Sequence, residues 1–248
     1  MTERQYISSV FIDEDIEKYS YLHSIPAVKF LEEGNKLQFR KPVTFFVGEN
    51  GTGKSTLIEA IAVAFGFNPE GGTMNFSFST NESHSGLWSK LMLTKQKYAK
   101  DGFFLRAESF YNVASYIEEL DRQPASAPFI TDSYGGKSLH KQSHGESFLS
   151  LVEHRFGGNG VYILDEPEAA LSPMRQLSLI AHINRLLKAD SQFIIATHSP
   201  ILMAFPEAEI LQFSNDGIKR VDYSDTEHYK ISKAFFDNPE GLLRHLID

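Results

Sequence analysis

Short apolar runs alternate with segments of helical spacing along most of the chain. Val43–Val47, Gly160–Glu166 and Gln192–Ala196 are rich in β-branched and aromatic residues, as buried strands are. Thr56–Phe65 and Pro173–Leu187 carry apolar residues three and four positions apart, which is the spacing of a helix with one buried face. Strands and helices in this alternation predict an α/β fold with a mostly parallel sheet and helices on both of its faces.

Weaker patterns predict smaller elements around this sheet. Further strands are expected at residues 5–12, 36–39, 73–80, 87–93 and 103–107. Further helices are expected at residues 28–33, at 109–120 and, in two short pieces, over 225–248. Asp101-Gly102 predicts a turn, and Asn215-Asp216-Gly217 predicts a hairpin between strands at 210–213 and 218–223. These short strands predict an antiparallel β subdomain beside the parallel sheet.

A glycine-rich stretch connects the first buried strand to the helix that follows it. Residues 48–55 fit the pattern G-x-x-x-x-G-K-[ST], in which glycines let backbone N–H groups turn toward a phosphate chain at a helix N-terminus. Lys54 would reach the β- and γ-phosphates, and the Ser55 hydroxyl would bind Mg²⁺. The alternative is a glycine-rich turn before an ordinary helix, which the two matching flanks disfavour. The predicted nucleotide contacts are Gly48, Glu49, Asn50, Gly51, Thr52, Gly53, Lys54, Ser55 and Thr56.

Asp165 and Glu166 end the second buried strand. Ligands of open α/β sheets bind beyond the carboxyl ends of the strands, so both side chains are expected to face the glycine-rich stretch. Asp165 is then the partner of Ser55 in binding Mg²⁺, and Glu166 is free to orient and deprotonate an attacking water. A helix-capping turn would also place acidic residues here. The neighbouring phosphate loop favours the catalytic interpretation.

His198 follows the third buried strand, ahead of Ser199-Pro200. An isolated histidine is more often structural, but a position at a strand end favours a functional role. That role would be a hydrogen bond to the γ-phosphate or to the attacking water. The three strand ends together predict a site for hydrolysis at a γ-phosphate.

Residues 122–138 are the one break in composition, with several proline and glycine residues that predict a mobile loop. The strands before and after this segment contribute to the same predicted site. We therefore interpret the segment as a loop within a single domain over residues 1–248, and not as a linker between two domains.

Composition limits the classes of function. The net charge of −8, from 24 basic and 32 acidic residues, does not support broad binding to a phosphate backbone. The chain has no cysteine, so disulfides and thiolate metal sites are excluded. No apolar run is long enough to cross a membrane and the N-terminus has no signal-peptide pattern, so no membrane insertion and a cytoplasmic location are expected.

Ser143-His144-Gly145-Glu146-Ser147 stands just before a predicted helix and completes a resemblance. The stretch looks like the signature motif of ABC-type ATPases, with His144 and Glu146 in place of the usual glycine and glutamine. Residues 48–56 then resemble their Walker A motif, residues 161–166 resemble Walker B with its catalytic glutamate, and His198 resembles the H-loop histidine. The order and rough spacing agree over residues 43–200, which identifies the chain as resembling the P-loop NTPases of this class.

The resemblance implies a mechanism. In this superfamily two heads bind ATP and Mg²⁺ and dimerise head to tail, so a homodimer on ATP binding is expected. The signature of each head caps the ATP held by the other. Ser143 would offer its hydroxyl, Gly145 would let backbone N–H groups approach, and the helix that begins near Gly145 would aim its positive end at the γ-phosphate.

The resemblance leaves the process driven by ATP open. Residues 166–168 and 197–200 look more like the soluble SMC- and RecF-like ATPases, although here without a coiled-coil insertion. That interpretation implies a switch acting on an unidentified protein partner, with nucleic acid possible by family analogy only. One alternative is the ATPase subunit of an ABC transporter. The other is a P-loop kinase, and the signature-like stretch and His198 argue against the kinase.

Two positions of the family pattern have no clear counterpart. Gln96 and Glu108 are the candidates for the Q-loop residue. The residues considered for stacking on adenine are Tyr19, Tyr21 and Phe39.

Overall fold

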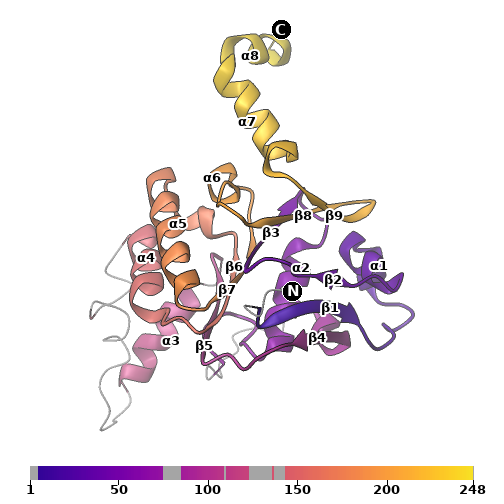
Figure 1. Cartoon of the computed structure of the whole chain (residues 1–248), viewed down its shortest axis with the longest axis vertical. Helices are drawn as coiled ribbons and strands as arrows, with labels where there is room; N and C mark the ends of the chain where they lie inside the picture. Colours follow the sequence, from indigo (N-terminus) through magenta and orange to yellow (C-terminus); the bar gives the residue numbers. More distant parts are fainter. Residues whose placement is uncertain (1–4, 75–84, 109, 123–135, 137–142, 248) are drawn as a thin grey trace.

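A six-stranded sheet forms the centre of the protein (Figure 1). The computed structural model describes residues 5–74, 85–108, 110–122, 136 and 143–247. Five strands are parallel and the sixth, β9, pairs antiparallel with β8. In order across the sheet the strands are β5 (Asp101–Arg106), β6 (Gly160–Asp165), β7 (Gln192–Ala196), β3 (Val43–Gly48), β8 (Glu209–Ser214) and β9 (Gly217–Val221). The α/β fold with a mostly parallel sheet is confirmed.

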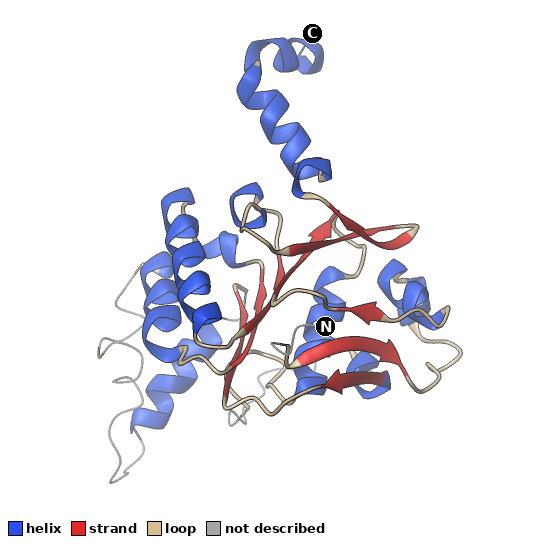
Figure 2. Ribbon diagram, in the orientation of Figure 1, coloured by secondary structure: helices blue, strands red, loops and turns tan. Residues whose placement is uncertain are grey.

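Helices cover both faces of this sheet (Figures 1 and 2). Alternate residues of each strand point to opposite faces, so each face has its own apolar core. Phe46 and Ile163 belong to the core shared with α1 (Pro26–Glu32) and α2 (Lys54–Phe65). Phe45 and Leu164 belong to the core on the other face. The helices on that face are α3 (Phe110–Arg122), α4 (His144–Arg155) and α5 (Pro173–Lys188).

A second sheet confirms the antiparallel β subdomain. Its strands, in the order β2-β1-β4, are β2 (Leu37–Gln38), β1 (Ile7–Ile12) and β4 (Leu91–Lys95). Gln192 at the start of β7 links it to the main sheet. The Gln192 Oε1 atom accepts hydrogen bonds from the backbone N–H groups of Tyr6 and Ile7, and its Nε2 atom donates to the Ile7 carbonyl, all at 2.8 Å.

Two predictions for the middle of the chain were wrong. Residues 87–90 belong to the 3₁₀ helix η2 (Gly86–Lys90), in which Leu87 is buried, and the strand begins only at Leu91. Asp101-Gly102 is not a turn but the start of β5. The Asp101 carboxylate accepts hydrogen bonds from Arg155, Gly157 and Tyr162, which fixes this strand beside β6. Most of the strand expected at residues 73–80, and of the loop at 122–138, lies outside the described residues.

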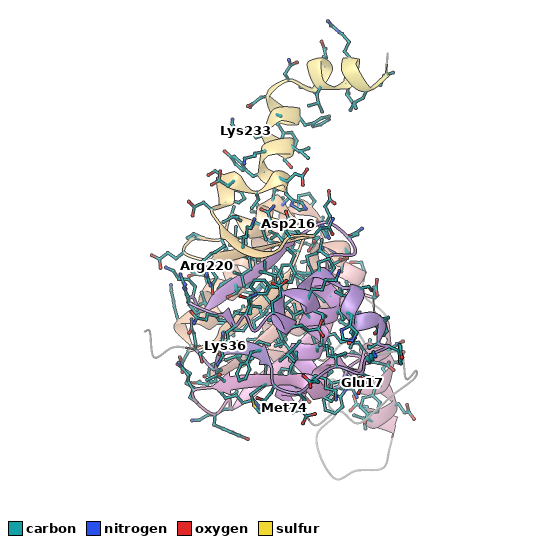
Figure 3. All side chains as sticks on the ribbon, turned by 90° about the vertical axis from the view of Figure 1, so that its right-hand side faces the viewer. Glu17, Lys36, Met74, Asp216, Arg220 and Lys233 are labelled. Carbon is teal, nitrogen blue, oxygen red and sulfur yellow. The ribbon has the colours of Figure 1, made fainter. Side chains whose placement is uncertain are left out.

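The C-terminal residues form a two-helix arm that extends away from the sheet (Figure 1). The arm consists of α7 (Glu227–Asp237) and α8 (Pro239–Ile247), which confirms the two predicted helices. The arm stands clear of the rest in the perpendicular view as well, where Lys233 of α7 is labelled (Figure 3). None of the residues of α7 is buried. The hairpin of β8 and β9, with its turn at residues 215–217, precedes the arm and also agrees with the prediction.

Candidate functional site

The glycine-rich stretch forms a loop between β3 and α2, as predicted. Gly48, Gly51 and Gly53 have positive φ angles of 141°, 82° and 94°, which glycine adopts without the steric cost of a side chain. A side chain at Gly48 would overlap the carbonyl group of Phe213 in β8, and one at Gly53 would overlap the Ile25 side chain. Glycine is therefore required at both ends of the loop, for its backbone angles and for close packing.

Lys54 is turned into the loop that precedes it. Its Nζ atom donates hydrogen bonds to the carbonyl oxygens of Gly48 and Glu49, each at 2.8 Å. The side chain is buried, which lowers the pKa of the ammonium group, while the carboxylates of Glu166 and Asp165 oppose this effect. The loop thus encloses a cation that interacts with both carboxylates at the end of β6.

Asp165 faces Ser55 at the carboxyl edge of the sheet. The Ser55 hydroxyl donates to Asp165 Oδ1 at 3.4 Å. Arg106, at the end of β5, places its Nε atom 3.5 Å from Asp165 Oδ2 and donates from Nη1 to Glu59 of α2 at 2.6 Å. Burial raises the pKa of Asp165 to about 6, against the opposing effect of the Arg106 charge. One oxygen of the carboxylate therefore faces the phosphate loop and the other faces an arginine.

The donor set at this edge fits Mg²⁺. Mg²⁺ commonly takes one or two protein oxygens and completes its shell with phosphate oxygens and water. The Ser55 hydroxyl and the Asp165 carboxylate supply such oxygens, and a buried carboxylate gains from a nearby cation. Among the described residues, no cluster of three or more His, Cys, Asp or Glu side chains could hold a metal ion by itself. A metal ion at this edge would accordingly depend on the phosphates for its remaining ligands.

Glu166 lies opposite His198. The backbone of Glu166 is left-handed, with φ and ψ both 51°, a conformation that costs a non-glycine residue about 1 kcal/mol or more. Its N–H group donates to the carbonyl oxygen of Ala196 in β7 at 3.0 Å, which holds the turn in place. Glu166 Oε1 then lies 3.7 Å from Nε2 of His198. The turns after β6 and β7 bring these two side chains together.

His198 is held on two sides and has one ring nitrogen without a hydrogen bond. Its backbone N–H donates to Glu168 Oε1 at 2.5 Å, and its Nδ1 atom lies 3.1 Å from Nε2 of His228. Burial and the Lys54 charge lower the pKa of the imidazole, which favours its neutral form. Within the described part of the chain, the buried Nε2 atom has no hydrogen-bond partner. A phosphate oxygen or a water between His198 and Glu166 would supply one.

A cavity of about 290 Å³ opens at this edge. Its lining residues are Ser55, Arg106, Ala107, Glu108, Asp165, Glu166, Ala169 and Ala170. A larger cavity of about 870 Å³ lies at the other edge of the sheet. Its lining residues include Val43 and Ser191, at the amino-terminal ends of β3 and β7. Ligands of parallel sheets bind at the carboxyl ends of the strands, so the smaller cavity is the better candidate.

Ser143 and Gly145 lie at the N-terminus of α4. Ser143 forms hydrogen bonds with Glu146 and Arg175, and Gly145 packs against Ala170, so neither residue contacts the phosphate loop through these interactions. The Ser143 hydroxyl donates to Glu146 Oε2 at 2.8 Å and accepts from Arg175 Nη1 at 3.2 Å. A side chain at Gly145 would come within 2.9 Å of the carbonyl oxygen of Ala170, so α4 packs closely there. Among the described residues, no hydrogen bond joins Ser143 to the phosphate loop of its own chain.

The structure adds residues that the sequence did not single out for this site. Arg106 reaches Asp165 through the pairing of β5 with β6, and no sequence pattern gives that pairing. Glu168 and His228 hold His198, from a turn and from the C-terminal arm. Of the two predicted candidates for the Q-loop residue, Glu108 lines the cavity and Gln96 is not among its lining residues, which favours Glu108.

The candidates for adenine stacking can also be narrowed. Phe39 is buried and its ring stacks on Phe46 at a centroid distance of 6.3 Å, so it has no free face. Tyr19 and Tyr21 are exposed.

Comparison with known families supports an ATPase. A family model described as "AAA domain" matches residues 24–123, which include the phosphate loop. A second, described as "AAA domain, putative AbiEii toxin, Type IV TA system", matches residues 122–204, which include Ser143, Asp165, Glu166 and His198. Two AAA-domain models thus match adjoining parts of the chain, and together they include every strand end of the candidate site. A comparison with curated proteins gives no match.

Solved structures of ATP-binding cassettes show the same fold as this chain. CbiO1 from Clostridium perfringens, part of the ABC transporter complex cbiONQ, is 16% identical with a TM-score of 0.55, over 98% of this chain and 99% of that one. The ATP-binding cassette MJ1267 of an ABC transporter is 16% identical with a TM-score of 0.53, over 92% and 99%. At these identities the likeness concerns the fold alone. In the described part of the chain, no helix has the length and apolar character needed to span a membrane.

Proposed function

We propose that this ATPase head is a molecular switch that binds Mg-ATP, dimerises head to tail and returns to a loose state when ATP is hydrolysed. The observation that carries the proposal is the meeting of Ser55, Asp165, Glu166 and His198 at the carboxyl ends of three neighbouring strands. Ser55 faces Asp165 and Glu166 faces His198, and the first three of these residues line the cavity. Hydrolysis at a γ-phosphate needs such a combination.

In this proposal each side chain has one role. The loop amides and Lys54 bind the β- and γ-phosphates, and the hydrogen bonds that Lys54 makes to Gly48 and Glu49 are exchanged for phosphate oxygens. Ser55 and Asp165 would hold Mg²⁺, which offsets the charge of the phosphates. Glu166 accepts the proton of the attacking water, and Nε2 of His198 binds the γ-phosphate or that water.

The dimer is supported by the position of the signature-like stretch. Ser143 is exposed at the start of the twelve-residue helix α4, where a helix terminus favours anions. Ser143 contacts Glu146 and Arg175 and, in the described residues, makes no hydrogen bond to its own phosphate loop, which supports a role toward the nucleotide of a second copy. A head-to-tail pair would give each phosphate loop the signature of the other chain.

The soluble SMC- and RecF-like branch remains our preferred placement, with an unidentified protein as partner. The motif that suggests it, residues 166–168, has a structural use here, because Glu168 holds the backbone of His198. The alternative is a subunit that docks on a membrane protein, and the likeness to transporter cassettes, which concerns the fold alone, does not decide between the two. Co-purification of the full chain with a membrane protein would support that alternative.

The decisive test uses Glu166→Gln. This variant keeps the shape and hydrogen bonding of the side chain but cannot accept the proton of water, so phosphate release should fall at least about 100-fold. ATP should still bind, and the variant should accumulate as an ATP-bound dimer by light scattering with Mg-ATP. Adding Ser143→Arg should abolish that dimer without changing the phosphate loop of the same chain.

Two results would contradict the proposal. A Glu166→Gln protein that binds ATP and remains monomeric would contradict the proposed head-to-tail dimer. A wild-type protein that transfers the γ-phosphate to an acceptor without releasing phosphate would be a kinase.

A further inference from the structure

The C-terminal arm reaches the ATP site through one side chain, His228. His228 lies in the first turn of α7, and its Nε2 atom is 3.1 Å from Nδ1 of His198. The two rings have a centroid separation of 5.3 Å and an interplanar angle of 55°, so they meet by their edges and not by stacking. Both side chains are partly buried. The contact joins a helix of the arm to the histidine that faces Glu166.

Other contacts fix this end of α7 independently of the histidine pair. Thr226 is fully buried and caps the helix, since its Oγ1 atom accepts from the Tyr229 N–H at 3.3 Å and donates to the Tyr223 carbonyl at 2.8 Å. The Tyr223 hydroxyl donates to the Pro200 carbonyl oxygen at 2.8 Å, two residues after His198. The first turn of α7 is therefore anchored to the loop that carries His198, and His228 is held in register with it.

The contact couples the tautomers of the two histidines. Two neutral imidazoles can form this bond in two ways, and one nitrogen must donate while the other accepts. If His228 Nε2–H donates, His198 Nδ1 accepts and the proton of His198 is on Nε2, which faces the Glu166 carboxylate at 3.7 Å. In the reverse arrangement a bare Nε2 lone pair would face that carboxylate. The negative charge of Glu166 therefore favours donation by His228.

We propose that His228 is a positioning residue, which holds His198 in the tautomer that carries its proton on Nε2 and aims that N–H into the space beside Glu166. The inference rests on the proposed ATPase function for its consequence. With the proton on Nε2, His198 can donate a hydrogen bond to a γ-phosphate oxygen or to the attacking water. Removing the partner that fixes the tautomer and orientation of a metal-bound histidine changes affinity or activity about 10- to 100-fold, and we expect an effect of that order for His198.

The test compares three variants of the full chain. His228→Leu removes the donor, whereas His228→Gln keeps an N–H donor at a similar reach. His182→Leu is the matched control, because His182 is a partly buried histidine on α5, outside the cavity lining. His228→Leu should lower kcat for phosphate release at least about 10-fold with KM for ATP unchanged. His228→Gln should restore most of kcat, and His182→Leu should equal wild type.

Nitrogen-15 NMR of the histidine rings gives a readout that does not depend on activity. The His198 signals, assigned with His198→Gln, should show an unprotonated Nδ1 and a protonated Nε2 in wild type. In His228→Leu the Nδ1 atom loses its hydrogen-bond partner, so the share of the tautomer with the proton on Nδ1 should rise above its wild-type level. A wild-type protein with the His198 proton on Nδ1 would overturn the inference, whatever its activity.

The kinetic outcomes separate this inference from the proposed function. A wild type that hydrolyses ATP, with a His228→Leu variant equal to it, overturns the role of His228 alone. A loss in His228→Gln as deep as in His228→Leu, with lower melting temperatures in both, overturns it in favour of a purely structural contact. A wild type without hydrolysis contradicts the proposed function, and the NMR measurement then still decides between the two tautomers.

Discussion

The phosphate-loop edge and the signature-like end of α4 are built in different ways. At the phosphate loop, bonds between distant elements hold buried charges, as Arg106 does with Glu59 and Asp165, whose side chains are 11% and 7% exposed. At α4, Ser143, Glu146 and Arg175 bond to one another at the surface, and the Glu146 side chain is 56% exposed. Exposed pairs exchange for water or another partner at little cost, and buried pairs do not. The first region is fixed in advance, and the second is free to change partners.

This difference agrees with the division of labour in the proposed switch. A site for chemistry benefits from groups that are held in place before the substrate arrives. A surface that must engage and release another head benefits from weak internal bonds, because the head gives them up on binding. Variants of the two regions should therefore differ in their effects on ATP binding, on stability and on pH dependence.

Lys54→Ala should have the largest effect on the phosphate-loop side. Charge-assisted hydrogen bonds are worth about 1.5–3 kcal/mol each, so losing two to phosphate oxygens should weaken ATP binding about 1,000-fold. Titration calorimetry with Mg-ATP measures this affinity, and thermal melting checks that the fold is kept. Lys97→Ala is the control, since Lys97 binds Asp190 away from the site. Unchanged ATP affinity in Lys54→Ala would show that the glycine-rich stretch is only a turn.

The sequence predicted the parts of the site that lie within one motif or at one strand end. The glycine spacing gave the loop, and the apolar runs placed Asp165, Glu166 and His198 at the ends of β6 and β7. Those groups meet because parallel strands present their carboxyl ends at one edge, which is a general rule and needs no knowledge of strand order.

The sequence did not predict the contacts that depend on strand order or on the C-terminal arm. Arg106 meets Asp165 because β5 joins the main sheet, whereas Asp101-Gly102 suggested a turn. His228 lies beyond residues 43–200, which resemble the family, in one of the two short C-terminal helices. Glu168 holds His198 from a short 3₁₀ turn. Each contact joins elements whose pairing has no local signal.

The same substitution at two arginines, one in each region, should change the free energy of unfolding by different amounts. Arg106→Met leaves Glu59 and Asp165 without their buried partner, so the free energy of unfolding should fall by about 3 kcal/mol. Arg175→Met removes an exposed bond to Glu146 and should cost less than about 1 kcal/mol. Urea unfolding of both variants against wild type, without nucleotide, measures the two values. Equal losses would mean that the two regions do not differ in the way described.

The contributions of the two regions to the free energy of unfolding should depend on pH with opposite signs. Burial raises the pKa of Asp165 from 3.8 to about 6, so the folded protein binds this proton more tightly than the unfolded chain does. The contribution of Asp165 to the free energy of unfolding should therefore decrease as pH rises from about 4 to about 6, by about 2 to 3 kcal/mol in total. The difference between wild type and Asp165→Asn, in urea unfolding without Mg²⁺ or nucleotide, isolates this contribution.

Glu146 should show the opposite sign and provides the matched control. Hydrogen bonds from Ser143 lower the pKa of Glu146, so its contribution is present above the ordinary pKa of a glutamate and is lost as pH falls. The difference between wild type and Glu146→Gln should thus grow with pH below about 5, while the difference for Asp165→Asn shrinks up to about 6. Opposite slopes would follow from one carboxyl being desolvated inside the site and the other being bonded at the surface. A flat difference for Asp165→Asn would show that Arg106 and Ser55 compensate fully for burial, and the phosphate-loop edge would then store no electrostatic cost for a bound cation to relieve.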